Sequence, residues 1–211
     1  MLNIEDLCFF YREDKKLFNH LNLELASGEK YILSGDNGSG KTTFLKILST
    51  LENEYSGQIK FEANDIKINS NKYRSNVSYF PITDLGGFER LTGRQNIMLL
   101  ASLDLVTKDE VASKIISWKD NPLFEESLDT PLYLCSTGMK HLLQLFRTTL
   151  GQKSIILIDE PFRSLDVLNT SFVLRQLKQL KSLVLITSHK DIDQNYGFQK
   201  IKLDHAHMSY M

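Results

Sequence analysis

Cysteine is scarce in this chain, in which Cys8 and Cys135 are the only two cysteines among 211 residues. They lie far apart and form no Cys-x-x-Cys pair, which is typical of a protein kept in a reducing compartment. No apolar stretch approaches the roughly 20 residues that a bilayer-spanning helix needs, and the N-terminus lacks the basic start and long apolar core of a signal peptide. We therefore expect a cytoplasmic protein that reaches a membrane only through a partner.

An excess of charge of either sign is also lacking, because 25 Lys and Arg residues face 26 Asp and Glu residues for a net charge of -1. This balance gives no global electrostatic case for nucleic acid or an anionic membrane surface as a ligand. The hydrophobic share of 42% and the charged share of 24% are ordinary for a globular protein. Internal repeats, low-complexity tracts and flexible linkers are missing too, so we expect residues 1–211 to form a single domain with, at most, an inserted subdomain.

The most informative segment present is Gly35–Thr42, called the phosphate loop below, which has the spacing G-x-x-x-x-G-K-[ST]. Its glycines let successive backbone N–H groups turn toward a phosphate chain, Lys41 supplies a positive charge, and Thr42 supplies a hydroxyl where a nucleotide-bound Mg²⁺ would sit. The apolar run 31–33 precedes the loop as a strand would, and 43–48 follows with helical character, so a helix N-terminus adds partial positive charge. This context disfavours the alternative of a chance octamer in a glycine-bearing loop.

Apolar periodicity predicts strands around this loop. Segments 21–25 and 57–61 alternate apolar and polar residues, and 77–80 is a short apolar run that ends at a proline. Segments 155–158 and 183–186 are continuous apolar runs, as expected of strands buried on both faces of a parallel sheet.

Helical patterns occupy the remaining long segments. From residue 91 to about 129 the sequence favours helices, and Thr92 with Gln95 and Thr107 with Glu110 have the spacing of capping boxes. We predict that this segment is a helical insertion. A further helix is predicted over Val167–Leu180, between the two buried strands.

Polar residues follow each buried strand, where open α/β sheets place their ligand chemistry. Asp159 and Glu160 end the first strand. Asp159 is suited to hold the Mg²⁺ shell, which is the Walker B role, and Glu160 is placed to orient or deprotonate a water that attacks the γ-phosphate. His189 follows the second strand, where it is suited either to a γ-phosphate contact or to ordinary structural hydrogen bonding.

These motifs together resemble the nucleotide-binding subunits of ABC transporters. The phosphate loop, Asp159–Pro161, Ser164–Asp166 and His189 come in that family's order and spacing, and the resemblance covers essentially the whole chain. It implies an α/β fold: a P-loop NTPase (RecA-like) core with a mostly parallel sheet, an N-terminal antiparallel β subdomain (about 1–30 and 57–75) and an inserted α-helical subdomain (about 91–135).

The resemblance also implies a site for Mg²⁺ and ATP that is sandwiched between two subunits. Tyr11 falls at the position of the aromatic that stacks on adenine, although by itself it would pass as an ordinary strand residue. Asp166 falls in the loop that links the two sites across the dimer, although by itself it would pass as a helix N-cap. Mg²⁺ would be held through Thr42 and Asp159. The expected nucleotide contacts are Tyr11, Gly35, Asn37, Gly38, Ser39, Gly40, Lys41, Thr42 and Thr43.

The chain departs from the family pattern at the signature loop, which aligns with Cys135–Met139. Ser136 and Gly138 keep a hydroxyl and a glycine for the ATP of the partner subunit, at the start of a helix expected over 139–150. Thr137 replaces a glycine and Met139 loses a polar amide. These changes are either a weakening of the signature or harmless drift.

A second departure lies after the strand 77–80. The family usually has a glutamine there that reaches Mg²⁺ and the attacking water, whereas this chain has Ile82. Thr83 or Asp84 would substitute only if the loop shifts its register, and the sequence leaves the choice open.

The resemblance therefore implies an ATP-binding and ATP-hydrolysing subunit, with weak turnover, that powers a separate membrane-spanning partner from the inner face of the membrane. The compact length favours an exporter. Its partners would be a second ATPase subunit, identical or different, and a transmembrane subunit, with no nucleic acid. One alternative is a soluble ATPase of this type acting on nucleic acid or ribosomes, but heptad runs and a second phosphate loop are missing. Another is a nearly inactive regulatory subunit, which Thr137 and Ile82 favour and Glu160 and His189 disfavour.

Overall fold

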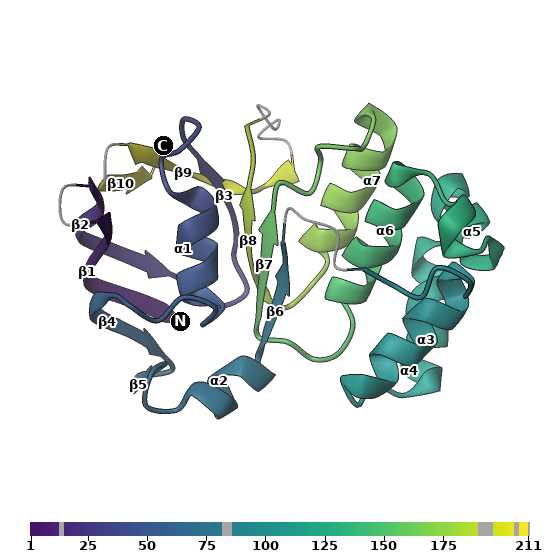
Figure 1. The fold of residues 1–211 in the computed structure, drawn as a ribbon, viewed down its shortest axis with the longest axis horizontal. Helices are drawn as coiled ribbons and strands as arrows, with labels where there is room; N and C mark the ends of the chain where they lie inside the picture. Colours follow the sequence, from purple (N-terminus) through teal and green to yellow (C-terminus); the bar gives the residue numbers. More distant parts are fainter. Residues whose placement is uncertain (13–14, 82–85, 190–195, 205–206, 211) are drawn as a thin grey trace.

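Two β-sheets organise the part of the chain that the computed structural model describes, which is every residue except 13–14, 82–85, 190–195, 205–206 and 211. Figure 1 shows α1 between the two sheets and α3 to α7 on the other side of the larger sheet. The elements are β1 (Leu2–Arg12), β2 (Lys15–Leu25), β3 (Lys30–Ser34), α1 (Lys41–Leu48), β4 (Ser56–Phe61), β5 (Asn64–Asp65), α2 (Ser70–Ser75), β6 (Val77–Phe80), α3 (Gly93–Leu103), α4 (Lys108–Trp118), α5 (Pro122–Asp129), the short 3₁₀ helix η1 (Leu132–Leu134), α6 (Thr137–Thr148), β7 (Ile155–Asp159), α7 (Val167–Lys178), β8 (Leu183–Thr187), β9 (Gln199–Asp204) and β10 (His207–Tyr210).

The larger sheet has the strand order β10-β9-β3-β8-β7-β6, in which all neighbours are parallel except β9 and β10. Strands β7 and β8 are buried at every position, which confirms the prediction made from their continuous apolar runs. Along β7, Ile156 and Ile158 pack with the helices α6 and α7, whereas Ile155 and Leu157 pack on the side of α1. The parallel arrangement brings the carboxyl ends of β3, β7 and β8 to one edge.

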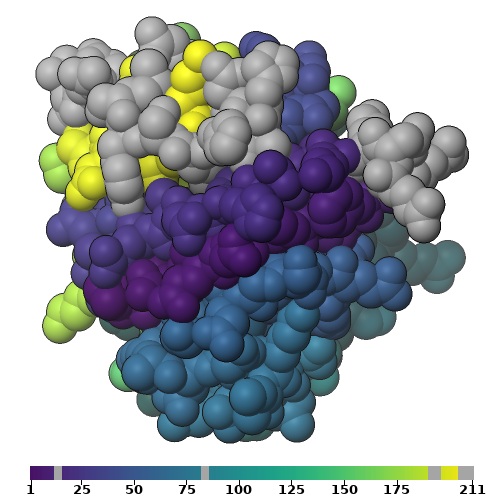
Figure 2. Space-filling model, turned by 90° about the vertical axis from the view of Figure 1, so that its left-hand side faces the viewer, coloured from purple at the N-terminus to yellow at the C-terminus, as the bar shows by residue number. Residues whose placement is uncertain are grey.

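The smaller sheet is antiparallel, with the order β2-β1-β4-β5. The alternation over 21–25 places Leu21, Leu23 and Leu25 in the core, as predicted. Strands β1 and β2 are antiparallel neighbours from the pair Leu2–Leu25 to the pair Arg12–Lys15. Figure 2 shows the hairpin of these two strands as a band across one face of the molecule.

The segment between β6 and β7 is helical, as predicted. The Thr92 side chain accepts from the N–H of Gln95 and completes a capping box, and Thr107 caps α4 by accepting from the N–H of Glu110. The prediction for the next helix was wrong at its start: α6 begins at Thr137 rather than at residue 139, because Ser136 provides the N-cap.

An aromatic cluster joins these helices to the helices that cover the larger sheet. Trp118 of α4 is fully buried, and its ring lies 5.2–5.4 Å from the rings of Phe124, Phe146 and Phe172, which belong to α5, α6 and α7. Contacts at these centroid distances fix the helices against one another. In the part of the chain that is described, no helix has both the length and the apolar character needed to cross a bilayer.

Candidate nucleotide-binding site

A cleft of about 320 Å³ opens where the phosphate loop meets the hairpin and the carboxyl ends of β7 and β8. This volume lies at the lower end of the range for small-molecule sites. Most of the residues predicted from the sequence to bind nucleotide, together with both residues predicted to be catalytic, converge here. The cleft is lined by Tyr11, Leu17, Asn37, Gly38, Gly40, Lys41, Thr42, Thr43, Glu160 and His189.

Close approach explains two of the loop glycines. Gly35 has φ +152°, and a Cβ built on it would lie 2.4 Å from the carbonyl oxygen of Leu203. Gly40 has φ +104°, and its Cβ would lie 2.9 Å from the side chain of Leu17. Only glycine fits both positions, so the loop packs closely against β9 and the hairpin.

Lys41 begins α1, and its side chain folds back over the loop. Nζ donates to the carbonyl oxygens of Gly35 at 2.7 Å and Asp36 at 3.0 Å. Burial lowers the pKa of Lys41, and the carboxylates Glu160, Asp159 and Asp36 act in the opposite direction. The ammonium group therefore sits in a partly dry site where an anionic ligand would relieve the cost of its burial.

Tyr11 lies at the rim of the cleft, near the end of β1. Its hydroxyl and the Thr43 Oγ1 are 2.5 Å apart, its ring meets Phe9 edge-on at 5.1 Å, and 58% of the residue is exposed. The structure thus ties this aromatic ring to the loop while leaving much of it uncovered, as a ring that stacks on a base requires. Leu17 from β2 supplies an apolar surface to the same cleft.

Asp159 and Glu160 are held by one hydroxyl that sequence reasoning missed. Thr187 Oγ1 donates to Asp159 Oδ1 at 2.6 Å and accepts from the N–H of Glu160 at 2.9 Å. The register explains this contact, because Asp159 and Thr187 pair directly across β7 and β8. From this strand end the sequence predicted only His189, since a threonine that ends an apolar run carries no distinctive signal.

Asp159 is 0% exposed, and among the described residues its Oδ2 has no hydrogen-bond partner. An unpaired buried carboxylate oxygen is costly unless a cation or donor satisfies it. Thr42, which carries a hydroxyl group, lines the cleft beside the phosphate loop. Carboxylate and hydroxyl oxygens are the ligand type that Mg²⁺ prefers, so these residues fit the metal that the sequence predicted.

Glu160 and His189 face each other across the cleft, with Glu160 Oε1 and His189 Nε2 3.0 Å apart. The Glu160 side chain is 13% exposed and that of His189 45%. Glu160 also has φ +50°, which is uncommon for a residue with a side chain. Such a backbone turn directs the carboxylate out of the strand and into the cleft.

The other predicted residues lie elsewhere. Ser136 caps α6 by accepting from the N–H of Met139 at 3.2 Å, and Asp166 caps α7 by accepting from the N–H of Asn169 at 2.8 Å. A Cβ on Gly138 would lie 3.4 Å from the carbonyl oxygen of Ser164, so the signature segment lies beside the segment that leads to Asp166. None of these three lines the cleft. Ser39 is in the loop, where its buried Oγ has no partner among the described residues. Ile82, Thr83 and Asp84 lie outside the described residues.

A parallel sheet with a phosphate loop after one strand and paired carboxylates after another defines the P-loop class of nucleotide-binding proteins. The family model described as "ABC transporter" matches residues 18–163, which is more than half of the chain. The chain therefore belongs to the ABC transporter family and contains that family's ATP-binding domain.

Relatives with assigned names agree with this family. The chain is 30% identical over 200 residues to the carnitine transport ATP-binding protein OpuCA of Listeria monocytogenes, with 90% of this chain and 50% of the relative covered. It is also 30% identical over 201 residues to the cytochrome c biogenesis ATP-binding export protein CcmA of Legionella pneumophila, with 92% and 96% covered. The chain thus spans about half the length of the OpuCA relatives and nearly all of CcmA.

Solved structures show the same fold. One, an ATP-binding subunit of an ABC transporter, superposes with a TM-score of 0.81 at 23% identity and covers 100% of this chain and 90% of the other. Another, a dimeric ATP-binding cassette in a post-hydrolysis state with ADP and Pi, gives a TM-score of 0.80 at 19% identity and covers 100% and 98%. The antiparallel N-terminal sheet, parallel core sheet and helical subdomain predicted from the sequence are thereby confirmed.

Proposed function

We propose that this chain binds Mg²⁺ and ATP in the cleft and hydrolyses ATP, releasing its γ-phosphate, to power a separate membrane-spanning partner. The observation that carries the proposal is the convergence of Lys41, Glu160 and His189 on one cleft beside the phosphate loop, with the buried Asp159 next to Glu160 at the end of β7. Phosphoryl transfer needs positioned positive charge for the phosphates and a polar group for the attacking water, and these residues supply both.

Each residue of the cleft has a role that its position supports. The loop N–H groups and Lys41 would bind the β- and γ-phosphates, and Tyr11 would stack on the adenine. Thr42 and Asp159 would hold Mg²⁺, which when bound neutralises phosphate charge. Glu160 would accept a proton from the attacking water, and His189, 3.0 Å from it, would orient that carboxylate and contact the γ-phosphate.

A second subunit would complete the site. Ser136, Gly138 and Asp166 lie outside the cleft of their own chain, which agrees with a role on the nucleotide of a partner chain. The large exposed apolar residues near them are available to a partner as well: Tyr133, Leu134, Val167 and Leu168. A second ATPase subunit, identical or different, would cover them.

The transport direction we propose is export, from the inner face of the membrane. Its support is the likeness to CcmA, whose name describes an export protein, which extends over 92% of this chain at 30% identity. Thr137 in the signature motivates the further proposal that the protein alone turns over slowly, since its side chain stands where a glycine would let the backbone approach the phosphate.

Glu160→Gln tests the assignment of the base. The purified wild-type protein should bind Mg·ATP and hydrolyse it slowly, and the variant should retain binding but lose the remaining hydrolysis, because an amide cannot accept the proton of water. Single-turnover hydrolysis and nucleotide affinity are measured together, with Glu54→Gln as the control at an exposed position outside the cleft. Hydrolysis by the Glu160 variant at the wild-type rate would reject the assignment. Binding without any hydrolysis by the wild-type protein would indicate a regulatory subunit.

A further inference from the structure

Tyr79 and Asp159 each have a buried oxygen atom without a hydrogen-bond partner in the described part of the chain. Among the described residues, neither the hydroxyl oxygen of Tyr79 nor Oδ2 of Asp159 makes a hydrogen bond, although both atoms are shielded from solvent. Leaving a buried polar group unpaired costs free energy, because its hydrogen bonds to water are lost and not replaced. Such a cost is commonly offset at a functional site, where the missing partner arrives with the ligand.

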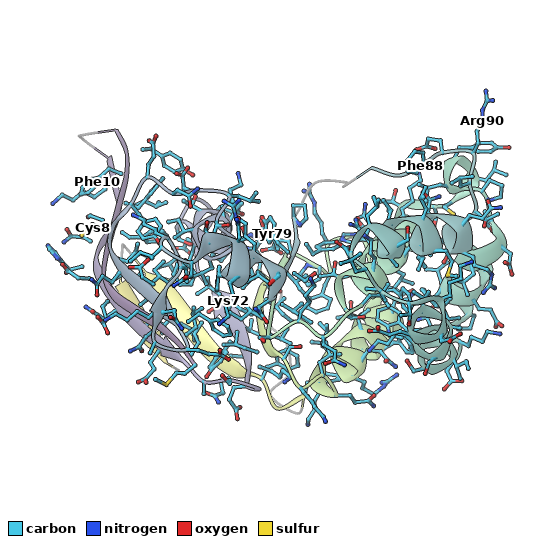
Figure 3. The ribbon with its side chains drawn as sticks, turned by 90° about the horizontal axis from the view of Figure 1, so that it is seen from below. Cys8, Phe10, Lys72, Tyr79, Phe88 and Arg90 are labelled. Carbon is cyan, nitrogen blue, oxygen red and sulfur yellow. The ribbon has the colours of Figure 1, made fainter. Side chains whose placement is uncertain are left out.

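The sheet register places these residues on one face. Tyr79 of β6 pairs with Leu157 of β7, and Asp159 follows two residues later on β7. Because side chains alternate along a strand, all three point to the face that carries α1. Tyr79 packs against the core on that side, which also contains Leu157. Figure 3 shows Tyr79 near the middle of the molecule, away from its outer edges.

The separation of the two residues suits a bridged contact. Neighbouring strands lie about 4.8 Å apart and rise about 3.3 Å per residue, so the backbones of Tyr79 and Asp159, two positions apart in this parallel register, are separated by roughly 8 Å. Burial, followed by the charge of Asp159, raises the pKa of Tyr79, so the phenol stays protonated at neutral pH. The charge of Asp159 thus acts on the phenol, and among the described residues neither oxygen atom has a hydrogen-bond partner.

We propose that Tyr79 is a positioning residue for the metal: with the free oxygen of Asp159, its hydroxyl holds the water shell of the nucleotide-bound Mg²⁺. The inference rests on the Mg·ATP site proposed above and adds a residue to it. Tyr79 would also supply a polar group beside the metal from β6. This strand precedes Ile82, which stands where the family usually has a glutamine. Through an outer-sphere contact of this kind, a residue tunes metal affinity without being a direct ligand.

A second tyrosine provides a matched control. Tyr55 is also buried, and its hydroxyl also lacks a partner among the described residues. It lies away from the cleft, with Lys67 Nζ 3.7 Å from the centre of its ring and Asp65 as its charged neighbour. Removing its hydroxyl therefore reproduces the loss of a buried, unpaired phenol without touching the metal site.

The experiment compares Tyr79→Phe, Tyr55→Phe and the wild-type protein by calorimetry of ATP binding, once in millimolar Mg²⁺ and once in excess chelator. We expect Tyr79→Phe to weaken ATP binding about 5- to 10-fold in Mg²⁺ and not in chelator, the effect of about one lost hydrogen bond. A Mg²⁺ titration at fixed ATP should shift by the same factor. Tyr55→Phe should match the wild-type protein in every arm.

Two outcomes would overturn the inference alone. One is that Tyr79→Phe binds ATP in Mg²⁺ as tightly as the wild-type protein does. The other is that the variant loses the same ATP affinity in Mg²⁺ and in chelator, which would mean that Tyr79 supports the phosphate loop or the fold rather than the metal. Absence of ATP binding by the wild-type protein would instead overturn the proposed function, and the inference would fall with it.

Discussion

At the scale of single residues, the Thr187 hydroxyl is the contact that links Asp159 and Glu160. It donates to Asp159 and accepts from the backbone of Glu160, so it fixes both the residue that would hold the metal and the residue that would act as base. Thr187 is itself fully buried, so water cannot replace it. The positions of Asp159 and Glu160 at the end of β7 therefore depend on the position of Thr187 at the end of β8.

Thr187→Val tests this coupling, because valine keeps the shape and removes the hydroxyl. We expect hydrolysis to fall about 10-fold or more through misplaced carboxylates and the free energy of unfolding to fall by about 1–3 kcal/mol, since Asp159 Oδ1 would be left unpaired. Single-turnover hydrolysis and urea unfolding measure the two effects. Thr148→Val is the control, because that residue is also buried and its hydroxyl also donates a hydrogen bond, to the Gln144 carbonyl at 2.9 Å, but it lies in α6. Equal losses of hydrolysis in the two variants would contradict the account.

The same residues show what the sequence could and could not predict. The phosphate loop and the Asp159–Glu160 pair were predictable because strong local patterns surround them. Thr187 was not, because its role depends on pairing between strands 28 positions apart. Leu17 was not predictable either, since only the fold of the hairpin brings it against Gly40.

At the scale of elements, capping decides where the helices begin. Thr92 and Thr107 were predictable from their spacing, whereas the helix after Ser136 was expected to begin at residue 139 and instead begins at Thr137, with Ser136 as its N-cap. The short helix α2 gave no periodic signal because Tyr73 is its only buried residue. Strand β9 was equally hidden, since it joins β3 as a parallel neighbour from the far end of the chain.

The aromatic cluster around Trp118 holds the helical elements together. We expect Trp118→Ala to lower the free energy of unfolding by about 3–5 kcal/mol, because it empties a fully buried site that contacts three other helices. Trp118→Phe should lose less, since a ring remains. Urea unfolding followed by circular dichroism measures both, and Leu105→Ala, at a position 91% exposed, serves as the control. A loss below about 1 kcal/mol for the alanine variant would show that the cluster is not an anchor.

At the scale of the whole molecule, folding buries a tyrosine whose ionisation links stability to pH. Burial, followed by Tyr55, raises the pKa of Tyr73 above its ordinary 10.0, and the Tyr73 hydroxyl donates to the Leu48 carbonyl at 2.7 Å. Above pH 10 the unfolded chain releases this proton while the folded chain keeps it, so stability falls as pH rises.

Tyr73→Phe removes this contribution. Between pH 8 and pH 11 the wild-type protein should lose about 1.4 kcal/mol more stability than the variant, which is the linkage of one group displaced by one pH unit. Urea unfolding at both pH values gives the difference, and Tyr133→Phe, at an exposed position, should behave as the wild-type protein. Identical pH dependence in the wild-type protein and Tyr73→Phe would contradict the assignment.

The family is thus established by comparison, while the site follows from how the two sheets meet. Calorimetric titration of ATP into the wild-type protein at millimolar Mg²⁺ tests the central claim most directly, with Lys41→Ala and Lys46→Ala as variants at the cleft and at an exposed position of the same helix. The account predicts saturable binding that Lys41→Ala weakens about 10- to 100-fold through the loss of charge-assisted hydrogen bonds and that Lys46→Ala leaves unchanged. No detectable binding by the wild-type protein, alone or with a second subunit, would contradict it.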